Sequence, residues 1–171
     1  MPQLRTERLS MVSWTQELVD AALDNPSRLE ALLGATIAKG FPNDPVRRFV
    51  LPTTRVRLQH NPADGEWSGM IIHVEDNVVI GSMGFKSPPN ENGLVEMGYD
   101  IVPSYRGQGY ATEMARALVN WAQQQSSVHH LTAECLSDNW ASIRVLEKLG
   151  MQRIEEHGTI IYWEFPIPEQ D

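Results

Sequence analysis

The feature that most restricts the fold is a strand, a proline and a glycine-rich turn that lead directly into a helix. Residues 94–102 alternate apolar and polar side chains as a strand does, and apolar residues between 111 and 122 recur at helical spacing. Pro103 has no N–H to donate to a strand ladder, so the strand must end there. Gly107 and Gly109 lie at the helix start, where the first N–H groups lack helical partners and the macrodipole is positive. This pattern predicts an anion site on the backbone, because glycines leave no Cβ in the way.

Arg106 strengthens this prediction, since its planar guanidinium suits phosphate oxygens. Three interpretations compete. The first is a glycine-rich turn that binds nothing. The second is a dinucleotide-binding fold, but Thr112 replaces the third glycine of that fingerprint and residues 127–131 hold no carboxylate for a ribose. The third is a coenzyme A site.

The third interpretation rests on a resemblance carried by several motifs. Arg106-x-x-Gly109-x-Ala111 resembles the acetyl-CoA signature of the GCN5-related N-acetyltransferase (GNAT) superfamily, and Asn139, at the start of a helix that ends in Leu149-Gly150-Met151, resembles a second family motif. With Glu96-Met97-Gly98-Tyr99 and Thr6-Glu7-Arg8-Leu9, the chain resembles the RimJ/RimL-like branch, which acetylates ribosomal-protein N-termini. The resemblance spans nearly the whole chain and is best in its second half.

The resemblance implies an α/β (α+β) fold with a mixed, mostly antiparallel sheet, a splayed central pair of parallel strands, and helices on both faces. A chain of 171 residues has the size of one domain, so we expect a single N-acetyltransferase domain over residues 1–171. Within it, about residues 1–67 are expected to form one wall of the acceptor site, and residues 68–171 the core with the acetyl-CoA site.

Local patterns predict most of the elements. Gly81 and Gly84 weaken one predicted strand and indicate that another segment passes close to it. The predicted elements are a first strand over 4–12, helices begun by Thr15 and by Asn25-Pro26, strands 69–75 and 78–86 joined by Asp76-Asn77, strand 94–102 parallel to a strand within 127–136, a helix from Asp138 or Asn139 to Leu149, and closing strands 152–156 and 159–165.

Composition narrows the functional classes. The net charge of −8, from 14 basic and 22 acidic residues, disfavours nucleic-acid binding and mildly favours a cationic substrate such as an amine or a basic peptide end. No run of 18 apolar residues and no charged-then-apolar leader is present, so we expect a cytoplasmic protein with no membrane partner. The single Cys135 cannot form an internal disulfide, which fits a reducing compartment. His129 and His130 lack partners at metal-ligand spacing, so no metal is expected.

For the cosubstrate acetyl-CoA, the resemblance implies contacts from three places in the chain. Backbone groups of Ile101 and Val102 are expected to pair with pantetheine, and Asn139 is expected to contact the coenzyme through its amide. As a sequence feature alone, Asn139 is a good helix N-cap. The residues expected around the pyrophosphate are Arg106, Gly107, Gln108, Gly109, Tyr110 and Ala111.

Acetyl transfer needs a base for the amine and an acid for the leaving thiolate. We hypothesise that Glu96 is the general base, because it lies on the less apolar face of the strand before the turn. Asp100 and His73 are alternatives, and a structural role for Glu96 stays open. The family often has a tyrosine as the acid at the position of Leu146; Ser142, one turn earlier, resembles the serine that replaces it in the RimL-like branch. Protonation of the thiolate by water also stays open.

The leading interpretation is an acetyl-CoA-dependent N-acetyltransferase that acetylates a primary amine by direct attack in a ternary complex. The acceptor, a protein N-terminus or a small-molecule amine, is left open. A non-catalytic acyl-CoA-binding or sensor module is the alternative, and Leu146 in place of the usual tyrosine supports it. A nucleotide-binding regulator is third. Related enzymes often dimerise, so the resemblance allows a homodimer.

Overall fold

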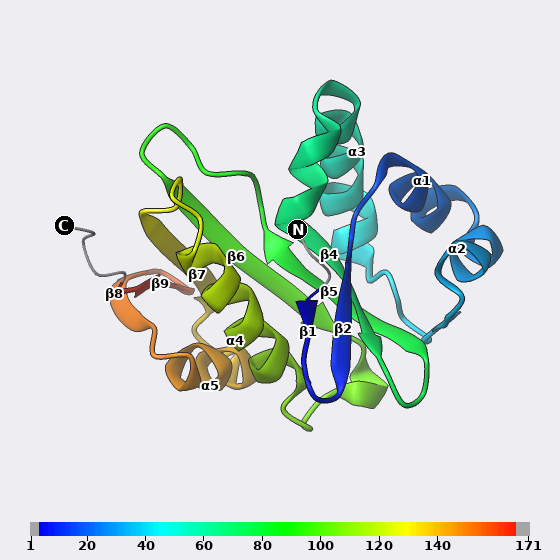
Figure 1. Cartoon of the computed structure of the whole chain (residues 1–171). Helices are drawn as coiled ribbons and strands as arrows, with labels where there is room; N and C mark the ends of the chain where they lie inside the picture. Colours follow the sequence, from blue (N-terminus) through cyan, green and yellow to red (C-terminus); the bar gives the residue numbers. More distant parts are fainter. Residues whose placement is uncertain (1–3, 167–171) are drawn as a thin grey trace.

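The computed structural model describes residues 4–166, and these form a mixed sheet of nine strands with five α-helices (Figure 1). The strand order is β1-β2-β4-β5-β6-β7-β9-β8, with β3 beside β5. The strands are β1 (Leu4–Arg5), β2 (Leu9–Ser13), β3 (Thr36–Ile37), β4 (Ser68–His73), β5 (Val78–Phe85), β6 (Leu94–Ile101), β7 (His130–Leu136), β8 (Gln152–His157) and β9 (Ile160–Phe165). The helices are α1 (Gln16–Asp24), α2 (Pro26–Leu33), α3 (Leu51–His60), α4 (Tyr110–Gln123) and α5 (Trp140–Lys148), with short η1 (Val46–Val50), η2 (Pro62–Trp67) and η3 (Pro103–Tyr105).

The sheet is mostly antiparallel, and β6–β7 and β3–β5 are its parallel pairs. Helix α4 is the crossover between β6 and β7, which is the connection that a parallel pair requires. The expected mixed sheet with a central parallel pair and helices on both faces is therefore confirmed.

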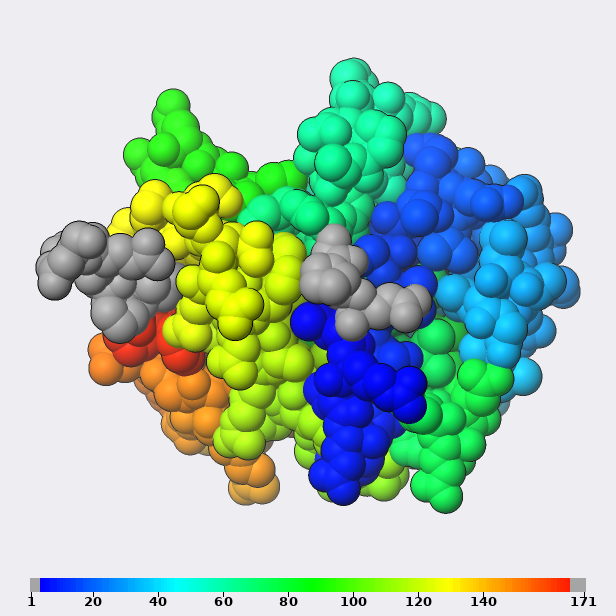
Figure 2. Space-filling view, in the orientation of Figure 1, coloured from blue at the N-terminus to red at the C-terminus, as the bar shows by residue number. Residues whose placement is uncertain are grey.

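The two halves of the sheet are covered differently. In β4 and β5 nearly all side chains are buried on both faces. Helix α4 contacts the neighbouring strands β1, β2 and β6, whereas η2 contacts β2 and β4, with α3 packed on η2 and α1 on α3. In β7 and β9 buried and accessible residues alternate, and every residue of β8 is exposed. The half of the sheet around β7 therefore keeps one face open. Figure 2 shows a hollow at the upper rim of the molecule, between α3 (teal) and the β5–β6 loop (green).

Local capping signals fix the first two helices. Thr15 Oγ1 accepts from Leu18 N at 3.2 Å, and Asn25 Oδ1 accepts from Arg28 N at 3.2 Å, as the sequence predicted. The single first strand over 4–12 is wrong, because the chain turns at residues 6–8 and returns as β2. The turn is closed by Thr6, whose N–H donates to the Leu9 carbonyl and whose hydroxyl oxygen accepts from the Leu9 N–H.

The predicted hairpin of β4 and β5 is confirmed, but β4 ends at His73 and the connection covers residues 74–77 rather than Asp76-Asn77 alone. The close approach at its glycines is also confirmed. A Cβ on Gly81 would lie 2.0 Å from the Asp100 carbonyl oxygen, and one on Gly84 would lie 2.3 Å from Ser68 Cα. No larger residue fits either position without moving backbone, so these glycines let β5 sit tightly between β4 and β6.

Strands β6 and β7 pair only over their first residues. The register runs from Leu94 beside His130 to Met97 beside Ala133 and then stops, although both strands continue. The two strands therefore diverge after Met97. Within residues 4–166, no helix is long and apolar enough to cross a membrane.

Candidate active site

The turn after β6 presents a row of unpaired backbone donors. Tyr105 N–H donates to Val102 O at 3.0 Å and Arg106 N–H to Pro103 O at 3.3 Å, and the first bond of α4 runs from Glu113 N–H to Gly109 O at 3.0 Å. Between these points, no acceptor within the described chain bonds the N–H groups of residues 107–112. The sequence predicted unpaired amides from residue 105 onward, whereas in the structure the first unpaired amide is that of Gly107.

The two glycines of the turn adopt a backbone that other residues rarely accept. Gly107 has φ +76° and Gly109 has φ +83°. Space in front of them is open, because a Cβ on Gly107 would meet nothing within 4 Å and one on Gly109 only Arg8 Nη2, at 3.6 Å. An anion can therefore approach this backbone closely.

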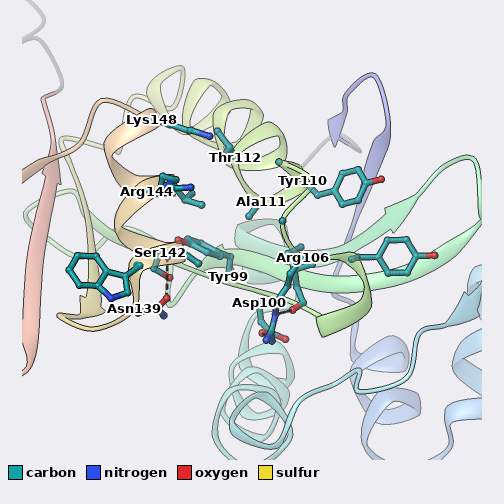
Figure 3. Close-up of a pocket in the computed structure, with 17 residues that line it drawn as sticks. Tyr99, Asp100, Arg106, Tyr110, Ala111, Thr112, Asn139, Ser142, Arg144 and Lys148 are labelled. Carbon is teal, nitrogen blue, oxygen red and sulfur yellow. Dashed lines mark hydrogen bonds and ion pairs between the residues drawn. The ribbon is translucent and has the colours of Figure 1, made fainter.

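The unpaired amides face a cavity of about 620 Å³ between the start of α4 and the face of α5 (Figure 3). Arg144 and Lys148, one turn apart on α5, line it, and Figure 3 shows Lys148 extending toward the first turn of α4. The sequence analysis missed both cations, as well as Tyr99. The predicted site residues that line this cavity are Ile101, Arg106, Gly107, Gly109, Tyr110, Ala111, Asn139 and Ser142; Val102, Gln108 and Glu96 do not line it.

The backbone at the end of β6 has one free edge. Val102 N–H donates to Ile80 O at 2.8 Å, toward β5. Because successive residues of a strand point their polar groups to opposite edges, those of Tyr99 and Ile101 point toward β7. The Ile101 carbonyl accepts from Arg106 Nε at 2.6 Å. The geometry does not support the expected pairing of Val102 with pantetheine, since its N–H and its carbonyl both have partners within the protein.

The side chain of Arg106 folds back onto β6, the strand that precedes it. Besides the Nε bond to Ile101, its Nη2 lies 3.6 Å from Asp100 Oδ1. Its side chain is still 57% exposed and lines the cavity, so a guanidinium face remains accessible. Asp100, an alternative for the base, is thus engaged with Arg106.

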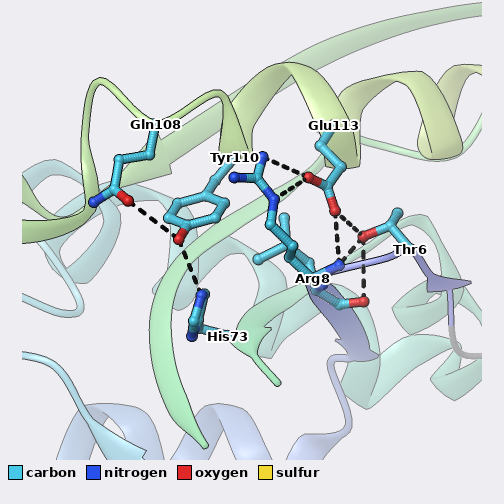
Figure 4. A network of polar contacts seen from close by, with 7 residues as sticks. Thr6, Arg8, His73, Gln108, Tyr110 and Glu113 are labelled. Carbon is cyan, nitrogen blue, oxygen red and sulfur yellow. Dashed lines mark hydrogen bonds and ion pairs between the residues drawn. The ribbon is translucent and has the colours of Figure 1, made fainter. Parts of the chain in front are cut away.

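Two polar networks fix the turn and the first turn of α4 to the rest of the sheet (Figure 4). Glu113 accepts from Thr6 Oγ1 at 2.6 Å, from Arg8 N–H at 3.0 Å and from Arg8 Nε at 2.7 Å. Burial opposes its charge, but these hydrogen bonds and the Arg8 charge outweigh burial and lower the pKa of Glu113. The Arg8 guanidinium also lies 4.4 Å from the centre of the Tyr110 ring.

The second network starts at His73, whose Nε2 lies 3.0 Å from the Tyr110 hydroxyl while its Nδ1 faces Asp76. Asp76 in turn accepts from the Tyr105 hydroxyl at 2.7 Å. His73 is 7% exposed and anchors the turn. Because His73 lies on β4, away from the gap between β6 and β7, it is a poor alternative for the base.

A second cavity, of about 330 Å³, fills the gap where β6 and β7 diverge. It adjoins the first, because Tyr99, Asn139 and Ser142 line both. Its other lining residues are Lys86, Met97, Gly98, Ala133, Glu134, Cys135, Leu136, Leu146 and Ile160, which come from both strands, from α5 and from the open face of the sheet.

Glu96 lies on that open face beside an ammonium group. Lys86 Nζ is 2.5 Å from Glu96 Oε1 and 3.5 Å from Glu134 Oε1. Burial lowers the pKa of Lys86, but the hydrogen bond and charge of Glu96, with those of Glu134, outweigh it and raise the pKa overall. Lys86 therefore stays protonated between two carboxylates.

Asn139 acts as the N-cap of α5, since its Oδ1 accepts from Ser142 N–H at 3.1 Å. No bond within residues 4–166 engages its side-chain nitrogen, which remains a free donor in both cavities. The same residues contain no cluster of three or more His, Cys, Asp or Glu able to hold a metal ion.

Comparison with known proteins identifies the class of this fold and site. Residues 35–152 match the family model of the acetyltransferase (GNAT) domain. Over 163 residues the chain is 32% identical to an uncharacterized N-acetyltransferase, YjdG, of Bacillus subtilis (strain 168), covering 95% of this chain and 97% of that protein. The chain therefore belongs to the GNAT acetyltransferase family, and it is an N-acetyltransferase.

Solved structures agree with this fold at low sequence identity. An acetyltransferase from Agrobacterium tumefaciens strain C58 superposes with a TM-score of 0.66 at 23% identity, covering 97% of this chain and 95% of that one. RimL, a ribosomal L7/L12 α-N-protein acetyltransferase solved with coenzyme A, superposes with a TM-score of 0.67 at 17% identity, covering 95% of this chain and 96% of that one. At these identities the likeness concerns the fold.

Proposed function

We propose that this N-acetyltransferase takes its acetyl group from acetyl-CoA and passes it to a primary amine by direct attack in a ternary complex. The observation that carries the proposal is the row of unpaired N–H groups at residues 107–112. A pyrophosphate placed there would meet the positive end of α4 and the cations Arg144 and Lys148 from across the cavity. The residues present thus fit the phosphates of coenzyme A.

Pantetheine would run from this first cavity into the second, along the free edge of β6. The Ile101 N–H points to that edge, and Asn139 offers its side-chain nitrogen nearby. The acetyl group would then lie in the gap between β6 and β7, where a backbone N–H can polarise its carbonyl.

The acceptor amine would enter from the open face of the sheet, opposite α4 and α5. Cross-strand register places Glu96 beside Thr132 and Thr132 beside Glu164, with Glu134 one pair further along. These carboxylates favour a cationic amine. Lys86 supports this assignment, because its own ammonium already lies between Glu96 and Glu134.

Glu96 is proposed as the base, acting on an amine that displaces Lys86 from it. Of the carboxylates on the open face, Glu96 and Glu134 are the ones that Lys86 bridges at the mouth of the second cavity. A peptide N-terminus is the acceptor we favour, following the RimJ/RimL-like motifs and the fold shared with RimL. A peptide end carries the required amine, and the hollowed rim beside α3 leaves room for the chain behind it (Figure 2).

Two measurements test the proposal. Calorimetry is expected to detect binding of acetyl-CoA and none of NAD; the reverse would refute the coenzyme assignment. A screen for thiol release from acetyl-CoA, with ribosomal-protein N-terminal peptides beside small amines, is expected to give turnover. Binding without release for any amine would instead support a non-catalytic acyl-CoA-binding module.

The role of Glu96 has its own control. Glu96→Gln is expected to lower kcat about 100-fold and to change its pH profile, whereas Glu156→Gln, on exposed β8, removes the same charge outside the site. An unchanged pH profile in Glu96→Gln would exclude Glu96 as the base.

A further inference from the structure

The hydroxyl of Tyr99 is a buried polar group that makes no hydrogen bond of normal geometry with any described residue, although the Ser142 hydroxyl lies near it. It is shielded from solvent. Buried hydroxyls usually have a partner, because an unsatisfied one costs free energy. Its position suggests the reason, since Tyr99 follows the last residue of β6 that pairs with β7 and lines both cavities.

The side chain of Tyr99 points to the helical side of the sheet. It follows Met97, whose side chain is buried under the helices, by two residues, so both share one face. Figure 3 shows the ring beside Ser142 and Asn139 at the start of α5. A thioester that passes from the first cavity into the gap between the strands must pass this ring.

Five groups that line the second cavity can carry a proton, namely Lys86, Tyr99, Glu134, Cys135 and Ser142. Glu134 lies 3.5 Å from Lys86 and is engaged with it. Lys86 is engaged by two carboxylates on the open face. Cys135 Sγ accepts from Trp163 Nε1 at 3.3 Å, so it already serves a structural contact. The hydroxyl of Ser142 is a far weaker acid than a phenol, whose ordinary pKa near 10 is within about two units of a thiol's.

We propose that Tyr99 is the catalytic acid of the acetyl transfer, with its phenol giving a proton to the departing sulfur. The inference rests on the proposed function, because it requires acetyl-CoA to occupy both cavities. It also supplies the acid that α5 lacks, since Leu146 lines the same cavity with an apolar side chain.

The step balances as follows. The acceptor nitrogen bonds to the acetyl carbon, and the bond from that carbon to sulfur breaks with its electron pair on sulfur. The Tyr99 proton moves to sulfur, which leaves free thiol and a phenolate. The phenolate regains a proton from solvent, matching the proton that the amine loses in becoming an amide.

Ser142 is a positioning residue in this scheme. Burial raises the pKa of the Tyr99 phenol, and the nearby Ser142 hydroxyl opposes that rise by stabilising the phenolate. Tyr99 is therefore protonated before the step, and Ser142 favours the phenolate that the step creates.

The test compares Tyr99→Phe, Ser142→Ala and Cys135→Ala in the full chain, with coenzyme A itself as the probe. The thiol of bound coenzyme A is titrated by its ultraviolet thiolate absorbance. Loss of a donor to the thiolate is expected to raise the apparent pKa of that thiol by roughly one pH unit in Tyr99→Phe, by less in Ser142→Ala, and not at all in Cys135→Ala.

Turnover gives the second measurement. With the best acceptor of the thiol-release screen, Tyr99→Phe is expected to lower kcat about 100-fold with little change in KM for acetyl-CoA. The ring stays in place and no hydrogen bond of normal geometry is lost, so the variant is expected to fold and to bind acetyl-CoA like the original chain.

The outcomes separate this inference from the function on which it rests. If the original chain fails to bind acetyl-CoA, the proposed function falls and the acid falls with it. If the original chain binds and transfers, but Tyr99→Phe changes neither the thiol pKa nor kcat, only the acid is refuted. A larger effect in Ser142→Ala or Cys135→Ala would equally overturn the assignment to Tyr99.

Discussion

The two edges of β6 behave as different structures. On the β5 side, pairing runs through Met97 to Ile101, and Gly81 lets the two backbones touch. On the β7 side, pairing stops at Met97, and the next residues face a cavity of about 330 Å³. One strand is thus closed along one edge and open along the other over the same residues.

The difference teaches how a stable strand can also bind. Because β5 satisfies one edge of residues 97–101, the other edge can leave polar groups free without loss of the sheet. The parallel partner β7 requires a crossover helix, and that crossover brings the N-terminus of α4 to the end of the open edge. The gap between β6 and β7 and the unpaired amides at the start of α4 therefore both result from the same crossover connection.

The largest expected effect tests the closed edge. A Cβ on Gly81 would lie 2.0 Å from the Asp100 carbonyl oxygen, whereas one on Gly98, in the open stretch, meets nothing within 4 Å. Gly81→Ala is expected to lower the free energy of unfolding by about 3 kcal/mol, and Gly98→Ala to change it by less than about 0.5 kcal/mol. Urea denaturation measures both, and equal losses would mean that the edges do not differ.

The next prediction gives opposite signs for stability and binding. Ala111 lines the first cavity in the first turn of α4, and Ala111→Asp places a negative charge among the unpaired amides. The free energy of unfolding is expected to rise by about 0.5 kcal/mol, while affinity for acetyl-CoA falls about 30-fold, or roughly 2 kcal/mol, through repulsion of the phosphates. Thermal denaturation and calorimetry measure the two, with Ala111→Asn as the uncharged control. Unchanged affinity in Ala111→Asp would place the phosphates elsewhere.

A smaller effect concerns the anchor of the open end. Removing the charge in Glu113→Gln is expected to lower the free energy of unfolding by about 1–2 kcal/mol at neutral pH, because three hydrogen bonds reach this carboxylate. The folded-state pKa of Glu113 is lowered, so this stability is present above the ordinary Glu pKa of about 4.3 and is lost as the pH falls through the folded value. Urea denaturation from neutral to acidic pH follows it. Glu7→Gln, at an exposed neighbour of Arg8, is the control. If Glu113→Gln stays less stable than the original chain by the same amount at acidic pH, the charge of the carboxylate is not the cause.

The smallest predicted effect belongs to the exposed cations of the first cavity. Arg144→Gln and Lys148→Gln are each expected to weaken acetyl-CoA binding about two- to five-fold, and less at high salt. Arg153→Gln, whose side chain faces Glu147 outside the cavity, removes the same charge and should leave binding unchanged. Calorimetry at two salt concentrations measures these affinities. If Arg153→Gln weakens binding as much as the other two variants, the effect comes from the overall charge of the protein and not from cations in the cavity.

What the sequence predicted well depends on neighbours in the chain. The caps at Thr15 and Asn25, the turn at Asp76-Asn77 and the two faces of β6 each follow from residues a few positions apart. The first strand was predicted wrongly because Thr6 closes a turn there, held by Glu113 at 107 residues' distance. No local pattern contains that contact.

The site was predicted in part for the same reason. The glycine turn lies in one stretch, so its donors could be read from spacing, although η3 occupies the first two amides. Tyr99 lies on β6, Lys148 on α5 and Lys86 directly after β5, and the three reach the cavities only through the tertiary fold. Their side chains alternate or recur like ordinary strand and helix positions, so spacing alone gave no signal.

The vacant amides of residues 107–112 also mean that α4 begins without a cap of its own, since Gly109 offers no side chain to it. Any phosphate bound there completes the helix as well as the site. By mass action, such a ligand stabilises the folded state by a free energy that grows with the logarithm of its concentration over its dissociation constant, so the melting temperature rises with ligand concentration. If that ligand is acetyl-CoA, as proposed, the stability of the protein rises with the supply of its cosubstrate.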